Sequence, residues 1–222
     1  MRKLLNDNMK KQLLFNLIFI FSISGFAQQL YIEYGSNILS FDYKNSQGMP
    51  LDNLLSQSKT YLGMGYRDNI NKEKTLYLSL GATYSGYGVI GSDLRLDNYY
   101  EWDVSYLGVT AGLDTKLFQL NDFLFYIKGA IATEFLIRGN QTINNQVYNL
   151  IGKEEFNKNI FFIKGSLGMQ YPISRSTAIF ANYTFGKTVL INSDTSEETL
   201  KLNAHQFGFG FVINLPNCNC DN

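Results

Sequence analysis

The chain has 222 residues, with 19 basic residues, 19 acidic residues, one histidine and two cysteines. The basic and acidic residues balance, and nothing indicates the basic patch that nucleic-acid binding requires. We therefore predict no nucleic-acid partner. A single histidine and two cysteines leave few ligands for a metal ion and few groups for catalysis. We therefore expect no catalytic, cofactor-binding or metal-binding residues.

The first residues follow the order of a secretory signal. Lys10 and Lys11 precede an apolar run over residues 13–21, and small residues then lead to Ala27. We predict a signal peptide over residues 1–27, cleaved after Ala27. The alternative is an uncleaved membrane anchor, which the length disfavours because the run is shorter than the ~20 residues of a spanning helix. No cysteine lies near the cleavage site, which argues against a lipoprotein.

The start of translation is open between Met1 and Met9, since Met9 directly precedes the two lysines. Loss of residues 1–27 removes four basic residues and one acidic residue, so the mature chain is slightly negative. Its length suits one domain. No later segment has 18 apolar residues in a row, which excludes a helical membrane protein.

After the signal, the sequence consists of segments in which bulky apolar residues alternate with small or polar ones. The clearest is residues 204–215, where Phe207, Phe209 and Phe211 alternate with Gln206 and two glycines. Successive side chains of a strand face opposite sides, so each such segment is a strand with one apolar face. The predicted strands are 30–42, 59–67, 75–87, 102–118, 122–138, 159–171, 177–187 and 204–215.

The connections between these strands alternate in length. Three are short (68–74, 119–121 and 172–176), and four are long (43–58, 88–101, 139–158 and 188–198). Short periplasmic turns and long outer loops are typical of outer-membrane barrels. A lipocalin-like soluble barrel would instead have a polar outside and an apolar interior. We therefore predict an all-β fold, an eight-stranded antiparallel up-and-down transmembrane β-barrel over residues 28–215.

The charged residues within the strands share the face that carries the glycines, which is the interior of such a barrel. We predict that they fill a lumen too narrow for a pore; a gated ion path is the alternative. Five basic and three acidic residues leave an excess that solvent or a bound anion would satisfy. They are Glu33, Arg67, Asp114, Lys116, Lys128, Glu134, Arg138 and Lys164.

Two reactive residue types remain. His205 lies on the lipid-facing side near the outer end of its strand, and we interpret it as an interfacial histidine. Cys218 and Cys220 lie in the tail, residues 216–222. They could form a strained bridge, bind a metal with another chain or pair between molecules. A reduced pair or a tail without function is the simpler interpretation.

The chain resembles the small outer-membrane protein β-barrel family, OmpA/OmpX-like and common in Bacteroidota. The features that carry the resemblance are Gly25-Phe26-Ala27-Gln28, Tyr34-Gly35, the glycine-aromatic strands and Phe207-Gly-Phe-Gly-Phe. It implies a Gram-negative outer-membrane location and insertion by the barrel-assembly machinery, which recognises an aromatic last strand. Unlike many members, this chain continues past that strand into a short periplasmic tail, residues 216–222. Some barrels of this size act on lipid A, but His205 lacks the His-x-Ser pattern of the deacylase.

The long connections are where binding would occur, since loops on a rigid scaffold carry function. Tyr99, Tyr100 and Trp102 are either an interfacial girdle or a recognition patch, and we favour the girdle. The polar third loop (Asn140–Thr142 and Asn144–Gln146) and the acidic residues 194–198 complete the outer surface. We predict a non-enzymatic structural or surface-binding protein that contacts outer-membrane lipids, lipopolysaccharide and an extracellular ligand. Alternatives are an accessory subunit of a secretion or uptake complex, a lipid-modifying enzyme or a small pore.

Overall fold

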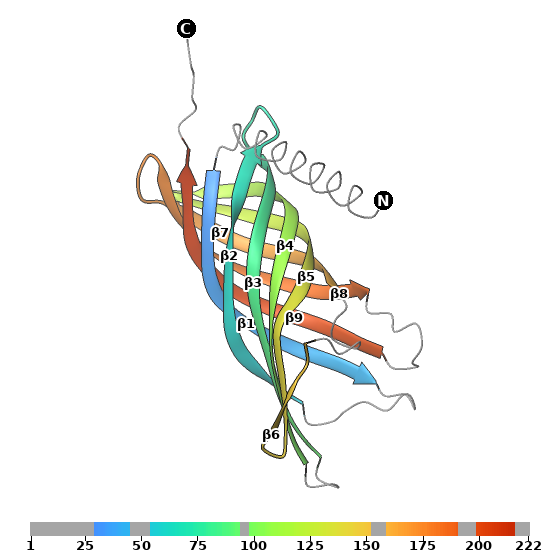
Figure 1. The fold of residues 1–222 in the computed structure, drawn as a ribbon. Helices are drawn as coiled ribbons and strands as arrows, with labels where there is room; N and C mark the ends of the chain where they lie inside the picture. The colour runs from blue at the N-terminus through green and yellow to red at the C-terminus, as the bar shows by residue number, and fades with distance from the viewer. Residues whose placement is uncertain (1–28, 45–53, 94–97, 152–158, 191–198, 216–222) are drawn as a thin grey trace, which may run out of the picture.

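The computed structural model describes residues 29–44, 54–93, 98–151, 159–190 and 199–215. These residues form nine antiparallel strands (Figure 1). The strands are β1 (Gln29–Lys44), β2 (Leu55–Asn69), β3 (Leu76–Asp93), β4 (Asn98–Leu120), β5 (Phe123–Ile143), β6 (Gln146–Asn149), β7 (Ile160–Pro172), β8 (Thr177–Leu190) and β9 (Thr199–Asn214). The described residues hold no helix that could span a bilayer.

Eight of these strands close into a barrel. Each long strand pairs with its neighbour in the chain, and β1 pairs with β9 from Gln29↔Asn214 to Lys44↔Thr199. The pairing of β4 with β5 completes the ring. β6 is an additional short strand that pairs only with β5 among the described strands. The predicted eight-stranded antiparallel up-and-down barrel is therefore confirmed.

The two faces of the wall follow the alternation of the sequence. On β9, Phe207, Phe209 and Phe211 are 53%, 59% and 50% exposed on the outside. The residues that alternate with them face inward, and Gln206 and Val212 are only 3% and 1% exposed. An apolar outside around a buried polar face is the reverse of a lipocalin-like barrel. The lipocalin-like alternative is therefore excluded.

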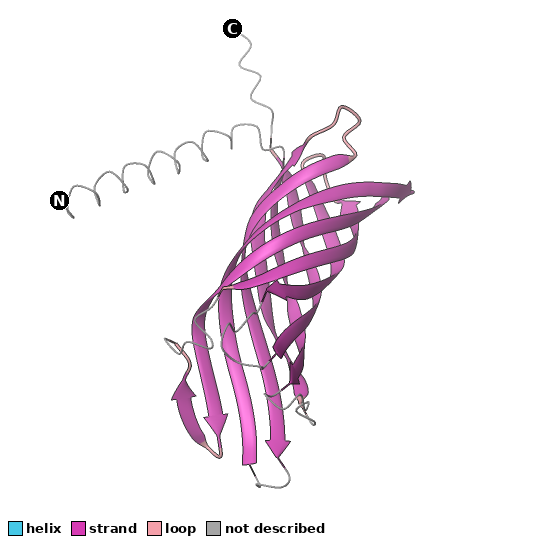
Figure 2. Ribbon diagram, turned by 90° about the vertical axis from the view of Figure 1, so that its right-hand side faces the viewer, coloured by secondary structure: helices cyan, strands magenta, loops and turns pink. Residues whose placement is uncertain are grey.

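The barrel has two different ends. At one end, here called the turn end, β1 begins, β9 ends and short turns join β2 to β3, β4 to β5 and β7 to β8 (Figures 1 and 2). These turns are fixed locally: Asn71 Oδ1 accepts hydrogen bonds of 2.9 Å from the backbone N–H groups of both Thr75 and Leu76. The β4–β5 turn uses Asn121 at a φ of 51°, in the left-handed region.

At the opposite end, here called the rim end, two segments that were predicted as loops differ from the prediction. Residues 88–101 are mostly strand, because β3 continues to Asp93 and β4 begins at Asn98. Residues 139–158 begin as strand: β5 continues to Ile143 and turns back at Asn144 and Asn145 into β6. These two asparagines have φ angles of 46° and 67°, the positive values that a two-residue hairpin turn needs. The predicted polar third loop is therefore largely a hairpin.

The wall divides at the rim end. β1 pairs with both neighbours as far as Ile38, but among the described strands its later residues pair only with β9. β5 pairs with β7 as far as Glu134, and its later residues pair with β4 and β6. The end of β8, the start of β9 and the end of β1 therefore turn to one side in Figure 1. β3, β4, β5 and β6 continue downward.

Several predictions fall on other residues. The signal peptide 1–27, the choice between Met1 and Met9, the acidic residues 194–198 and the tail with Cys218 and Cys220 lie outside the described residues.

Candidate functional site

The interior near the turn end holds a network centred on Asp114 of β4, which is 3% exposed. Its Oδ2 lies 3.4 Å from Arg67 Nη1 of β2, and its Oδ1 lies 3.7 Å from Lys128 Nζ of β5. The Ser79 hydroxyl of β3 donates a 3.2 Å hydrogen bond to the same Oδ1. Four strands thus contribute to one carboxylate, as the inward parity of these residues predicts.

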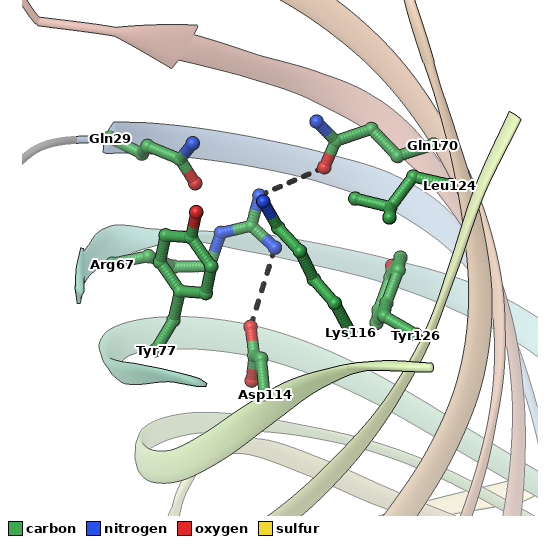
Figure 3. Close-up of a pocket in the computed structure, with 8 residues that line it drawn as sticks. All are labelled: Gln29, Arg67, Tyr77, Asp114, Lys116, Leu124, Tyr126 and Gln170. Carbon is green, nitrogen blue, oxygen red and sulfur yellow. Dashed lines mark hydrogen bonds and ion pairs between the residues drawn. The ribbon is translucent and has the colours of Figure 1, made fainter. Parts of the chain in front are cut away.

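A cavity of about 40 Å³ opens beside this network at the turn end (Figure 3). Arg67 extends into the middle of its lining and donates from Nη2 to Gln170 Oε1 at 3.1 Å. Lys116 reaches the same space, and its Nζ lies 5.2 Å from the centre of the Tyr77 ring. The cavity is lined by Gln29, Arg67, Tyr77, Asp114, Lys116, Leu124, Tyr126 and Gln170.

A second polar cluster lies farther from the turn end. Lys164 Nζ of β7 is 2.9 Å from Glu134 Oε1 of β5. The Tyr87 hydroxyl donates to the other carboxylate oxygen at 2.8 Å. Buried charges are tolerated when they are paired and hydrogen-bonded, and this pair meets both conditions.

Glu33 on β1 occupies the interior between these two clusters and is 8% exposed. Its carboxylate lies against Gly208 of β9, where the Cβ of any other residue would overlap Glu33 Oε1. The glycine opposite Glu33 therefore makes room for the carboxylate. The close approach of Glu33 thus explains the glycine at position 208.

The interior toward the rim end also holds an apolar cluster, which the prediction of a lumen filled by polar side chains did not include. The rings of Tyr87 and Tyr106 are 5.7 Å apart, and those of Tyr87 and Phe162 are 6.3 Å apart. The inward parity of these aromatic residues was visible in the sequence, but their common contact was not. We call this group the rim cluster: Leu39, Tyr87, Val104, Tyr106, Ala132, Leu150, Ile160, Phe162, Leu202 and Ala204.

Arg138 is exposed and does not line the interior, so its predicted placement was wrong. The pairing of β4 and β5 passes from Tyr106↔Leu136 to Ser105↔Arg138 and leaves Ile137 as an extra residue. Such a bulge shifts the alternation by one position. Arg138 therefore turns outward. The other seven predicted interior charges are buried or half-buried.

The outside of the wall carries an apolar band with aromatic pairs near both ends. Toward the turn end, Phe118 and Phe125 stack with their ring centres 4.7 Å apart. Toward the rim end, His205 Nδ1 lies 2.7 Å from the Tyr183 hydroxyl, and its ring is 5.2 Å from Phe185. The predicted outward position of His205 is confirmed.

Tyr99, Tyr100 and Trp102 lie on β4 rather than on a loop. The rings of Tyr100 and Trp102 stack at 5.8 Å, and Trp102 packs against the rim cluster. Tyr99 remains 41% exposed. Only part of this aromatic group is therefore accessible to a partner.

Among the described residues, no three His, Cys, Asp or Glu side chains gather in a way that could hold a metal ion. Five of the interior charges instead form pairs: Asp114 with Arg67 and Lys128, and Glu134 with Lys164. Such pairs can hold the wall together and attract a charged ligand.

No known family model matches this sequence, and no significant match is found among curated proteins. Similar folds occur among solved structures of closed barrels. Neisserial surface protein A is 11% identical, with 84% of this chain and 97% of that protein covered and a TM-score of 0.47. OprG, an outer membrane protein of Pseudomonas aeruginosa, is 14% identical over 85% and 96%, with a TM-score of 0.49. Ail, the attachment invasion locus protein of Yersinia pestis, is 14% identical over 84% and 99%, with a TM-score of 0.41.

Proposed function

We propose that this protein spans a Gram-negative outer membrane as a barrel after cleavage of its signal peptide. The observation that carries the proposal is the distribution of side chains, apolar outside and polar inside. Ile163, Leu167 and Phe209 are 57%, 59% and 59% exposed on the outside, whereas Glu134 and Asp114 are 0% and 3% exposed inside. Exposing so much apolar surface to water would be unfavourable, whereas lipid tails accept it.

The same proposal orients the barrel. The short turns of the turn end face the periplasm, and the extended strands of the rim end project to the outside, as in outer-membrane barrels generally. The aromatic β9 serves as the segment that the barrel-assembly machinery recognises.

The biochemical role we propose is non-enzymatic, structural or surface-binding. The rim end offers the binding surface, because Tyr99, Val147, Tyr148 and Ile151 are 41%, 66%, 46% and 54% exposed there. Aromatic and aliphatic side chains on a rigid sheet can bind an extracellular ligand or the sugars and lipids of lipopolysaccharide.

A second candidate role is an accessory subunit of a secretion or uptake complex. The exposed Val147 and Ile151 near β6 favour this role, since a larger protein partner would cover them. A stable partner retained during purification in mild detergent would support it over a free surface protein.

The test of the membrane proposal combines two measurements on cells that express the protein. Extracted protein should migrate differently on gels with and without boiling, because folded barrels resist detergent. Protease added to intact cells should cleave only at the rim end, for example near Tyr148. A protein recovered from the periplasm without membranes, with no shift on boiling, would overturn the proposal.

A further inference from the structure

Basic groups outnumber acidic ones around the cavity at the turn end. Arg67 and Lys128 share the single carboxylate of Asp114. Lys116 lines the same cavity and has no carboxylate within 4.0 Å among the described residues. Glu33, the next carboxylate inward, does not line this cavity. The cavity therefore lacks a negative charge to balance Lys116.

Arg67, like Lys116, has a polar group without a hydrogen-bond partner in the described part of the chain. Its side chain is nine-tenths buried, yet its Nε has no hydrogen-bond partner among the described residues. An unpaired charged donor in a buried position is costly. Figure 3 shows the Arg67 side chain in the middle of the cavity lining, so the positive charge of its guanidinium lies beside any group that enters the cavity.

The Tyr77 ring positions both basic groups. Arg67 Cζ lies 5.8 Å from its centre and Lys116 Nζ lies 5.2 Å from it. The ring attracts cations through its face, so it favours both groups near the cavity without neutralising either. Positive charge is thereby concentrated around the single carboxylate of Asp114.

The volume of about 40 Å³ limits what can enter. It exceeds the ~10–15 Å³ that one water molecule needs, and it suits a group of a few heavy atoms. An oxyanion accepts several charge-assisted hydrogen bonds at once, which Arg and Lys supply better than neutral donors.

We propose that the cavity binds one small oxyanion, a carboxylate or a phosphate, between the Arg67 guanidinium and Lys116 Nζ. Both basic groups keep their protons and donate charge-assisted hydrogen bonds to the anion. The site lies inside the wall at the turn end. It does not depend on the role proposed for the rim end.

The test is calorimetric titration of the purified full chain, folded in a non-ionic detergent, with sodium phosphate and separately with sodium acetate. Sodium chloride keeps the ionic strength constant. Lys116→Gln removes the unbalanced charge and Lys116→Arg retains it. The matched control is Lys187→Gln, which removes an exposed lysine from the outside of β8.

We expect saturable binding of phosphate or acetate, with the apparent Kd weakened roughly tenfold or more in Lys116→Gln. Lys116→Arg and Lys187→Gln should bind within about threefold of the unchanged chain. The anion that binds with the lower Kd shows whether the site takes a phosphate or a carboxylate. Equal binding by Lys116→Gln, or no saturable heat from either anion, would overturn the proposal.

The gel-mobility shift on boiling is recorded for every sample before titration. If the gel mobility of a preparation shifts on boiling but the protein binds no anion, the proposed anion site is wrong and the membrane proposal is unaffected. Arg67→Gln is a less suitable variant, because it also removes the ion pair with Asp114 and can prevent folding.

Discussion

Glu134 of β5 and Lys164 of β7 form an ion pair of 2.9 Å whose side chains are 0% and 6% exposed. The strand register places Lys164 opposite Ala130 rather than Glu134, so the lysine side chain reaches along the barrel to its partner. Tyr87 binds the second carboxylate oxygen and connects β3 to the same pair. The interior is therefore linked across three strands at this level.

Glu134→Gln should lower the free energy of unfolding by about 3–5 kcal/mol, because it leaves the Lys164 charge buried without its partner. Replacing both residues, with Glu134→Leu and Lys164→Met, should restore stability to within about 2 kcal/mol of the unchanged protein. Urea unfolding followed by the fluorescence of Trp102, the single tryptophan, measures both. Equal losses in the single and double variants would contradict a buried-charge penalty.

Gly35→Ala should destabilise the seam between β1 and β9. Gly35 lies opposite Gly208 in the register, and a Cβ there would overlap the Phe207 carbonyl oxygen and lie 2.9 Å from Gly208 Cα. Backbone atoms cannot yield easily, so we expect a loss of about 1–3 kcal/mol. The matched control is Gly129→Ala on the outside, where a Cβ would meet no atom within 4 Å. A comparable loss in Gly129→Ala would mean that strand propensity, not crowding, dominates.

Phe209→Arg tests whether the outside of the wall contacts lipid. Phe209 is 59% exposed in the middle of β9, and an arginine near the bilayer midplane costs about 2–4 kcal/mol. Reversible unfolding from lipid vesicles measures the loss. Tyr148→Arg on β6, 46% exposed at the rim end, is the control and should change stability by less than about 1 kcal/mol. If both variants are equally stable, Phe209 does not lie in lipid.

The rim cluster should prevent ion flow through the barrel. The unchanged protein should show no stepwise conductance in planar bilayers, because Tyr87 and Phe162 are each 1% exposed in the interior. Phe162→Ala should lower stability by about 3–5 kcal/mol through the cavity it leaves. Steady channels in the unchanged protein would show that the interior is not closed at this level.

The orientation can be tested by labelling single cysteines in a parent in which Cys218 and Cys220 are replaced by serine. Tyr148→Cys at the rim end should react with a membrane-impermeant maleimide on intact cells. Asn71→Cys in the β2–β3 turn should react only after the outer membrane is opened. The unlabelled parent serves as the control. The reverse pattern would place the turn end outside.

Strand number and wall faces were predictable because each strand carries its own alternation, as in Phe207, Phe209 and Phe211. The strand ends were less predictable. The polarity of residues such as Asn140 and Gln141 predicts a loop, yet they pair with Asp103 and Trp102 of β4. At the rim end the sheet extends beyond the apolar band, so polarity no longer distinguishes strand from loop.

The sequence by itself determined the closed barrel, its apolar outside and the inward direction of seven charged residues, since these depend only on alternation along each strand. The tertiary structure decided which charges meet. Strand tilt and register bring Lys164 to Glu134 and leave Lys116 without a carboxylate partner among the described residues. It also decided the position of Arg138, because one extra residue at Ile137 reverses the alternation. Contacts between strands depend on register, and register is a property of the closed ring rather than of any one segment.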